Sequence, residues 1–185
     1  MKESKTQSED LKSIAYRQMK LSFGELTPEQ EKKYNEILKL NLLKAKIYEA
    51  SDIDIEVLVN LYNKSWITSN TPYRRIEAET MMSLYHNPEI IILIAKFYGI
   101  PAGFIILDFA GAKDQYSSIL ALGILPRFQH RGLGRFLGLN ALKYFKQRDI
   151  RELRSEVYVD DIVSYKFNLA MGFEEIDVKT YTNEV

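Results

Sequence analysis

A glycine-bearing loop between a strand-like run and a helix start is the feature that most constrains the fold of this chain. The run Ser117 to Leu125 is followed by Pro126 and then by the loop Gln129-His130-Arg131-Gly132-Leu133-Gly134. A helical pattern continues from there to about Lys146. Glycine lets the backbone approach a ligand closely, and the first N–H groups of a helix lack partners within the helix. The segment therefore predicts an anion site where a helix begins beside a strand.

The charges around this loop also favour an anion. The 185 residues include 25 Lys and Arg and 25 Asp and Glu, so the formal net charge is zero. Between Arg127 and Arg154, however, eight basic residues occur with only two acids, Asp149 and Glu152. A local excess of positive charge suits phosphate groups. The loop is neither a dinucleotide-binding GxGxxG motif, because its third glycine is displaced by one residue, nor a P-loop, because the Lys-Ser/Thr ending is missing.

From residue 44 onward, segments with helical periodicity alternate with strand-like segments. The expected strands are 44–49, 90–97, 103–109, 117–125, 153–159 and 173–180. The expected helices are 55–66, capped by Asp52 or Asp54, then 76–85, 132–146 and 161–171. The order βααβββαβαβ predicts a mixed α/β domain over residues 44–185, in which helices flank a central sheet.

Residues 1–43 differ in composition, with one Gly, one Pro and many Lys, Glu and Gln residues. Thr27-Pro28-Glu29-Gln30 is typical of a helix start, and an earlier helix is expected near Asp10 to Lys20. The segment is therefore predicted to be a helical N-terminal extension that packs on its own domain or on a second copy, as in a homodimer. The apolar stripe to be buried there is Tyr34, Ile37, Leu38 and Leu42.

The loop and its surroundings resemble the acetyl-CoA signature of the Gcn5-related N-acetyltransferases, the GNAT family. Gln129-x-x-Gly132-x-Gly134 follows a strand that ends Leu122-x-Ile124-x-Pro126. Val157, Asp161 and Met171-Gly172-Phe173 lie where the family has its second signature, although the family has Asn in place of Asp161. The resemblance covers about residues 44–181. It implies a GNAT fold with a twisted, mostly antiparallel sheet.

The resemblance also implies acetyl-CoA as the co-substrate, without a metal. Backbone amides of Arg131 to Arg135 would hold the pyrophosphate. Asp161 is interpreted foremost as a helix cap, although it lies at a cofactor-contacting position. The cofactor-binding residues expected from the resemblance are Leu122, Ile124, Gln129, His130, Arg131, Gly132, Leu133, Gly134, Arg135, Asp161 and Asn168.

The family transfers the acetyl group directly to an amine, and the absence of cysteine excludes an acyl-cysteine intermediate. Glu156 is the expected general base, because some peptide-directed members carry a catalytic Glu at this position; Asp108 is a second candidate. Asn168 lies at the position where the family usually has a Tyr that acts as the general acid. A side-chain amide cannot protonate a thiolate in the usual way. Tyr165, one helical turn earlier, is the alternative acid, and solvent is another proton source.

Two classes of function remain open from the sequence. The first is an N-acetyltransferase for a primary amine of a protein, peptide or small molecule, and the second is a non-catalytic acyl-CoA-binding sensor or regulatory module. Acceptor contacts are expected in residues 66–75 and 110–116, which are alternatively ordinary surface loops. The two histidines, His86 and His130, do not form a metal site by themselves.

Other partners are not expected. The phosphates of CoA account for the basic segment, so nucleic-acid binding is not needed to explain it. The longest apolar run, Ile90 to Ala95, is too short to cross a membrane, and the first residues lack the apolar core of a signal peptide. A cytoplasmic location is therefore expected.

Overall fold

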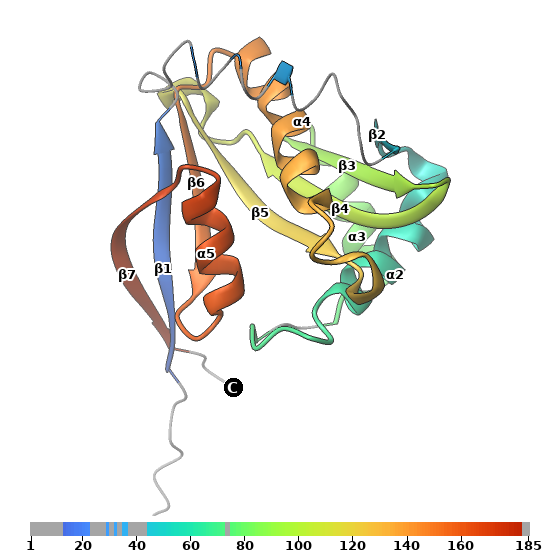
Figure 1. Ribbon diagram of the computed structural model, residues 1–185, viewed down its shortest axis with the longest axis horizontal. Helices are drawn as coiled ribbons and strands as arrows, with labels where there is room; N and C mark the ends of the chain where they lie inside the picture. Colours follow the sequence, from blue (N-terminus) through green and yellow to red (C-terminus); the bar gives the residue numbers. More distant parts are fainter. Residues whose placement is uncertain are drawn as a thin grey trace, which may run out of the picture.

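The computed structural model describes residues 13–22, 44–72 and 75–182, together with four isolated positions, Glu29, Lys32, Asn35 and Glu36. These residues form a seven-stranded sheet with helices on both faces (Figure 1). The strands are β1 (Ser13–Ser22), β2 (Ala45–Glu49), β3 (Ile90–Phe97), β4 (Ile100–Asp108), β5 (Tyr116–Ile124), β6 (Glu152–Tyr158) and β7 (Glu174–Thr182). The helices are α2 (Ile55–Ser65), α3 (Ala78–Tyr85), α4 (Leu133–Gln147) and α5 (Ile162–Ala170).

From Ala45 onward the elements follow the expected order βααβββαβαβ. The clearest difference in bounds is at β4, which begins at Ile100 rather than at residue 103. A tight turn at Tyr98 and Gly99 precedes it, and both residues have positive φ, 49° and 81°. Glycine adopts such angles without steric cost, which makes it suitable for a hairpin turn between β3 and β4.

The middle strands β3 and β4 are buried on both faces of the sheet, which explains their almost continuously apolar sequences. Alternate residues of a strand point to opposite faces. Ile92 and Ile94 pack in the core that contains α2 and α3, whereas Leu93 and Ala95 pack in the core that contains α4. Figure 1 shows α4 and α5 on the same side of the sheet, with α2 and α3 on the other.

The neighbours β5 and β6 run parallel, and their pairing is short. It stops where Ile119 lies opposite Ser155. A shift in the pairing with β4 leaves Leu120 as a bulge at the same place, and a bulge bends its strand. Beyond it, β5 pairs with β4, while β6 pairs with β1 on its other side (Figure 1). The two strands therefore separate and leave a gap in the middle of the sheet.

The N-terminal segment is a strand, so the helix expected near residues 10–20 and the helical nature of the extension there are wrong. β1 lies within the sheet between β6 and β7 and is antiparallel to both (Figure 1). Of the second expected helix, the described positions Glu29, Lys32, Asn35 and Glu36 are helical. The apolar stripe of that helix, Tyr34, Ile37, Leu38 and Leu42, lies outside the described residues.

Pairing with distant residues explains why local sequence did not reveal β1. Its segment includes Arg, Gln, Met, Lys and Leu, which are good helix formers. In the fold, Tyr16 lies opposite Tyr158 of β6 and Lys179 of β7. Met19 and Leu21 are 1% and 6% exposed in the core under α4. Tertiary burial and two strand ladders therefore override the local helix preference.

Replacing Met19 with Ala tests whether β1 is part of the folded domain. Loss of this buried side chain leaves a cavity, and we expect the free energy of unfolding to fall by about 2–5 kcal/mol. Gln18→Ala, at the adjacent half-buried position, should change the free energy of unfolding by less than about 1 kcal/mol. Urea denaturation measures both variants. Equal midpoints for Met19→Ala and the parent protein would show that β1 does not dock in the core.

Candidate active site

A cavity of about 1150 Å³ opens where β5 and β6 separate. The end of β5 and the end of β6 form two of its walls, and the start of α4 and the residues of α5 form the others. The loop after α2 and Tyr16 of β1 complete the wall. Segments far apart in the sequence thus meet at one site in the sheet.

The predicted anion loop forms one end of this cavity. Gly132 is the N-cap of α4 and has a φ of 79°, and His130 before it also has a positive φ, 57°. The first helical hydrogen bond of α4 runs from the Phe136 N–H to the Gly132 carbonyl, at 3.0 Å. The amides ahead of Phe136 belong to the first turn, where a helix has no internal acceptors for them. They are suited to an anion.

Gln129 holds the loop against β5. Its side-chain amide donates to the Ile124 carbonyl at 2.9 Å, and its side-chain oxygen accepts from the Thr68 hydroxyl at 3.4 Å. The motif glutamine therefore orients the loop in this structure through the end of the strand.

Gly134 leaves space in the cavity that another residue would occupy. A Cβ atom at this position would lie 3.4 Å from Phe167, 3.6 Å from Leu122 and 3.7 Å from Ile124, and these three side chains line the cavity. Such distances are ordinary contacts. An added methyl group is therefore tolerated by the fold, whereas a larger side chain extends into the space a ligand would use.

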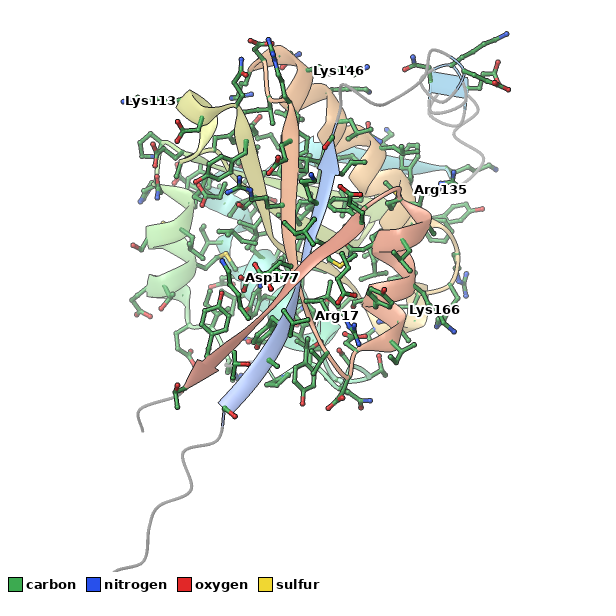
Figure 2. The ribbon with its side chains drawn as sticks, turned by 90° about the vertical axis from the view of Figure 1, so that its left-hand side faces the viewer. Arg17, Lys113, Arg135, Lys146, Lys166 and Asp177 are labelled. Atoms are coloured by element: carbon green, nitrogen blue, oxygen red, sulfur yellow. The ribbon has the colours of Figure 1, made fainter. Side chains whose placement is uncertain are left out.

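The basic residues of the segment 127–154 do not all lie at the loop. Arg135 and His130 line the cavity, and so does Lys166 of α5. Figure 2 shows Arg135 and Lys166 on the side of the sheet that carries α4 and α5. Arg154, by contrast, lies 2.7 Å from Glu152 and stacks over Tyr116. Arg154 therefore does not add to the positive charge of the cavity wall, whereas α4 and α5 supply cations to it.

Glu156 of β6 also lines the cavity. Its neighbour Val157 packs in the core that contains α4, so Glu156 lies on the opposite face of the sheet, and this part is called the other end of the cavity. The Glu156 carboxylate accepts a hydrogen bond of 2.6 Å from the Tyr181 hydroxyl of β7. The Tyr16 ring packs against the rings of both Tyr158 and Tyr181, with centroids 5.9 and 5.8 Å apart. Asp160 adds a second carboxylate to the wall and accepts from the Tyr158 hydroxyl at 3.0 Å. This end is acidic and aromatic.

Asp161 caps α5 and ties the loop after α2 to it. Its carboxylate accepts from the Ser164 N–H at 3.0 Å and from the hydroxyls of Ser164 at 2.9 Å, Ser69 at 2.9 Å and Thr71 at 2.5 Å. Burial by itself raises the pKa of Asp161, but these hydrogen bonds outweigh it and lower the pKa. The buried carboxylate thus holds one wall of the cavity in place.

Asn168 and Tyr165, both on α5, have different surroundings. Asn168 is buried and lines the cavity, and its side-chain amide donates to the Ser164 carbonyl at 2.9 Å. Tyr165 is not part of the described cavity wall. Its ring lies under Arg17, 4.6 Å from the guanidinium, and a hydrogen bond to Glu175 raises the pKa of its hydroxyl.

Most of the remaining candidates from the sequence line the cavity, and a few do not. Leu122, Ile124, Gln129, His130, Gly132, Leu133, Gly134 and Arg135 all line the cavity together with Glu156. Arg131 and Asp108 do not belong to the described wall; Asp108 instead accepts from the Ala110 N–H at 2.8 Å. Of the segment 66–75, Trp66, Thr68, Ser69, Asn70, Thr71 and Pro72 line it, and none of 110–116 does within the described wall.

Tyr16, Tyr181, Ser69 and Thr71 were missed as individual site residues by sequence reasoning. The two tyrosines reach Glu156 only because β1 and β7 pair beside β6. The two hydroxyl residues reach Asp161 across 90 or more positions. A short polar stretch with Pro72, following a helix, was the only local signal for them.

The comparison with protein families decides the membership. Residues 55–173 match the acetyltransferase (GNAT) family. The chain belongs to this GNAT family of acetyl-CoA-dependent acetyltransferases. No curated protein sequence matches it.

Solved structures support the same fold. A PaiA N-acetyltransferase from Thermoplasma acidophilum in complex with coenzyme A is 25% identical, covers 74% of this chain and 99% of its own, and has a TM-score of 0.59. The ribosomal-protein-S18-alanine N-acetyltransferase of Escherichia coli has a TM-score of 0.61 at 16% identity, covering 72% and 79% of the two chains. An aminoglycoside acetyltransferase from an uncultured soil metagenomic sample, in complex with sisomicin, has a TM-score of 0.63 at 15% identity, covering 77% and 97%.

The described residues contain no group of three or more His, Cys, Asp or Glu side chains arranged to hold a metal ion. Within the same ranges, no helix is both long and apolar enough to cross a membrane.

Substituting Gly134 tests the loop assignment. We expect Gly134→Val to weaken acetyl-CoA binding at least tenfold in calorimetry, because the added side chain extends from the loop into the cavity. Gly134→Ala is the matched control, since its methyl group makes only ordinary contacts, and it should weaken binding less. Thermal unfolding shows whether both variants fold. A folded Gly134→Val protein with the affinity of the parent would remove the loop from the binding site.

Asp161→Ala tests whether the ionised Asp161 carboxylate stabilises the fold, through the pH dependence of the unfolding free energy. At pH 7 we expect unfolding free energy to fall by about 1–3 kcal/mol, because a helix cap and two loop contacts are lost. The pKa of Asp161 is lowered in the folded state, so its contribution is present above the unfolded value near 3.9 and is lost as pH falls through the folded value. The difference from the parent should therefore shrink below about pH 4. Urea denaturation at several pH values measures this difference in unfolding free energy. A difference that is constant with pH would contradict a stabilising role of the ionised carboxylate.

Proposed function

We propose that this protein is an N-acetyltransferase that moves the acetyl group of acetyl-CoA directly to a primary amine. The observation that carries the proposal is the polarity of the single cavity at the β5–β6 gap. One end has helix-start amides and cations, and the other end has Glu156 among tyrosines. The positive end suits an anionic acyl donor, and the end with Glu156 suits a cationic amine acceptor.

The donor end fits acetyl-CoA by its chemistry. The amides of residues 132–135 and the side chains of Arg135, His130 and Lys166 suit the phosphates. Gly134 leaves the space beside Leu122 and Ile124 open for the chain that links the phosphates to the thioester. The separated edge of β5 offers backbone groups to the amides of that chain. A related N-acetyltransferase at 25% identity holds coenzyme A, which supports this assignment.

Glu156 is assigned as the base. A primary amine is mostly protonated near neutral pH and must lose a proton before it becomes a nucleophile. The carboxylate of Glu156, directly or through water, takes this proton. The amine nitrogen then forms the C–N bond with the acetyl carbon as the C–S bond breaks, and the electron pair of that bond stays on sulfur. The nitrogen loses its second proton to water, which leaves the neutral amide. Acetyl-CoA supplies the activated carbonyl and the thiolate leaving group.

The leaving thiolate takes its proton from solvent in this proposal. Tyr165, the acid suggested from sequence, is engaged with Glu175 and Arg17 outside the described cavity wall. Asn168 lines the cavity and can donate a hydrogen bond through its amide, but it cannot transfer a proton in the usual way. A thiol has a pKa near 8.5, so a bound acid is not required for the thiolate to leave.

A non-catalytic acyl-CoA-binding module is the second candidate, and Asn168 is the observation that favours it. Asn168 lies at the position of the family's usual general acid, and its side-chain amide already donates a hydrogen bond to the Ser164 carbonyl. Thiol release separates the two candidates. Release above background with one or more amines supports the enzyme, whereas tight binding of acetyl-CoA without release from a broad amine panel supports the module.

Glu156→Gln tests the proposed base. We expect turnover to fall by about 100-fold or more, with the largest loss at low pH, where the amine is most protonated. The assay follows thiol release with an alanyl tripeptide, an N-α-protected lysine amide, n-propylamine and sisomicin as acceptors. Glu152→Gln on the same strand is the control, because this side chain is not part of the described cavity wall. Parent-like rates for Glu156→Gln at every pH would exclude Glu156 as the base.

A further inference from the structure

The acceptor end of the cavity depends on two residues that the family-matched region does not supply: Tyr16 lines it, and Tyr181 bonds to Glu156 of its wall. The match covers residues 55–173, and both Tyr16 of β1 and Tyr181 of β7 lie outside it. Both nevertheless reach the carboxylate region of Glu156. A site built partly from residues outside the shared domain is where acceptor specificity of this particular chain is expected to reside.

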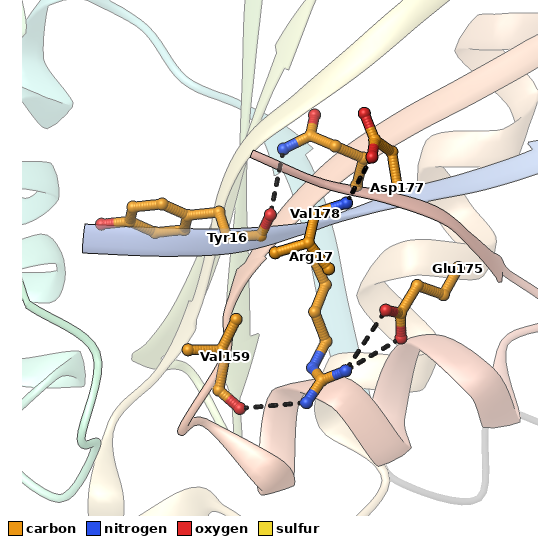
Figure 3. Close-up of polar contacts among 7 residues, drawn as sticks. Tyr16, Arg17, Val159, Glu175, Asp177 and Val178 are labelled. Atoms are coloured by element: carbon orange, nitrogen blue, oxygen red, sulfur yellow. Dashed lines mark hydrogen bonds and ion pairs between the residues drawn. The ribbon is translucent and has the colours of Figure 1, made fainter. Parts of the chain in front are cut away.

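The strand β1 presents different side chains to the two faces of the sheet. Arg17 points toward α5, pairs with Glu175 of β7 at 3.0 Å, and donates to the Val159 carbonyl before α5 at 3.4 Å (Figure 3). The ring of Tyr16, the preceding residue, points away from the Arg17 side chain, as alternation along a strand requires (Figure 3). Arg17 thereby fixes the strand between β7 and the turn before α5, and holds Tyr16 at the cavity.

The tyrosines surround the Glu156 carboxylate rather than covering it. Tyr181 donates to one carboxylate oxygen, and Glu156 itself stays exposed in the cavity wall. Tyr16 packs on Tyr181 and on Tyr158, and it lines the cavity together with Tyr62 of α2. Burial, and then the charge of Glu156, raises the pKa of Tyr16, so its hydroxyl stays neutral near pH 7. Neutral rings beside a carboxylate form a suitable environment for an organic cation.

We propose that Tyr16, Tyr158 and Tyr181, together with Glu156, form the subsite that binds the acceptor amine in its ammonium form. The rings of Tyr16 and Tyr158 contact the ammonium and the adjacent methylene groups. Tyr181 is a positioning residue, because its hydroxyl holds the Glu156 carboxylate without touching the acceptor. This assignment rests on the proposed function, since it names the residues that recognise the amine in that reaction.

Binding of n-propylammonium to the CoA-loaded protein tests the subsite without any acetyl group being present. The probe is compared with 1-propanol, which has a similar size and no charge, by chemical-shift titration. We expect the parent to bind the cation at least tenfold more tightly than the alcohol. Tyr16→Ala should weaken cation binding about tenfold, Tyr16→Phe should restore most of it, and Glu156→Gln should reduce it to the level of the alcohol.

Two further variants separate recognition from folding. Lys20→Gln lies on the same face of β1 as Tyr16, away from the described cavity wall, and should bind the cation as the parent does. Tyr181→Phe keeps the ring that packs on Tyr16 and removes only the hydroxyl, so we expect a several-fold rise in KM for the amine with KM for acetyl-CoA unchanged. Thermal unfolding confirms that each variant folds.

The outcomes distinguish this inference from the proposed function. If the folded Tyr16→Ala protein binds n-propylammonium as the parent does, or if the parent does not prefer the cation to the alcohol, the subsite is wrong. Thiol release in the amine panel would still support the enzyme in that case. If no amine gives thiol release but cation binding follows the variants as expected, the transfer reaction is wrong and the subsite stands.

Discussion

The short parallel pairing of β5 and β6 is the constraint on which the rest of the site depends. Hydrogen bonding between the strands ends at Ile119 and Ser155, next to the bulge at Leu120, and the strands then follow different neighbours. The sheet stays continuous at one end and opens at the other. Without this separation, the first turn of α4 would face paired strands, and Glu156 would lie in a closed sheet instead of a cavity wall.

The cavity that results divides its chemistry between two groups of elements. The start of α4 and part of α5 provide cations and free helix-start amides, which suit phosphates. The strands β6, β1 and β7 provide Glu156 and three tyrosines, which suit an amine. Asp161 joins the loop after α2 to α5 and so fixes the distance between the walls. Geometry and charge thus both support the proposed places of the donor and the acceptor.

Local sequence was sufficient for most of the elements from Ala45 onward and for the loop that begins α4. Hydrophobic periodicity and turn residues predict the elements from Ala45 onward. Two glycines ahead of a helical pattern predict the loop at Gly132. Local sequence failed at β1, because the strand is stabilised by partners in β6 and β7 rather than by its own preferences. The same failure hid Tyr16 and Tyr181. For Tyr165, helical spacing gave its position on α5 near Asn168 but no information about Arg17, which packs on its ring.

Backbone amide shifts on titration with acetyl-CoA test the central claim, that the β5–β6 gap is the donor site, most directly. The account predicts that the largest changes cluster at residues 132–135 and at 120–124, and that changes at Tyr16 and Tyr181 are small until an amine is added. Largest changes at α2 and α3, with residues 120–124 and 132–135 unaffected, would contradict it. That result would place the ligand on the other face of the sheet, away from the gap.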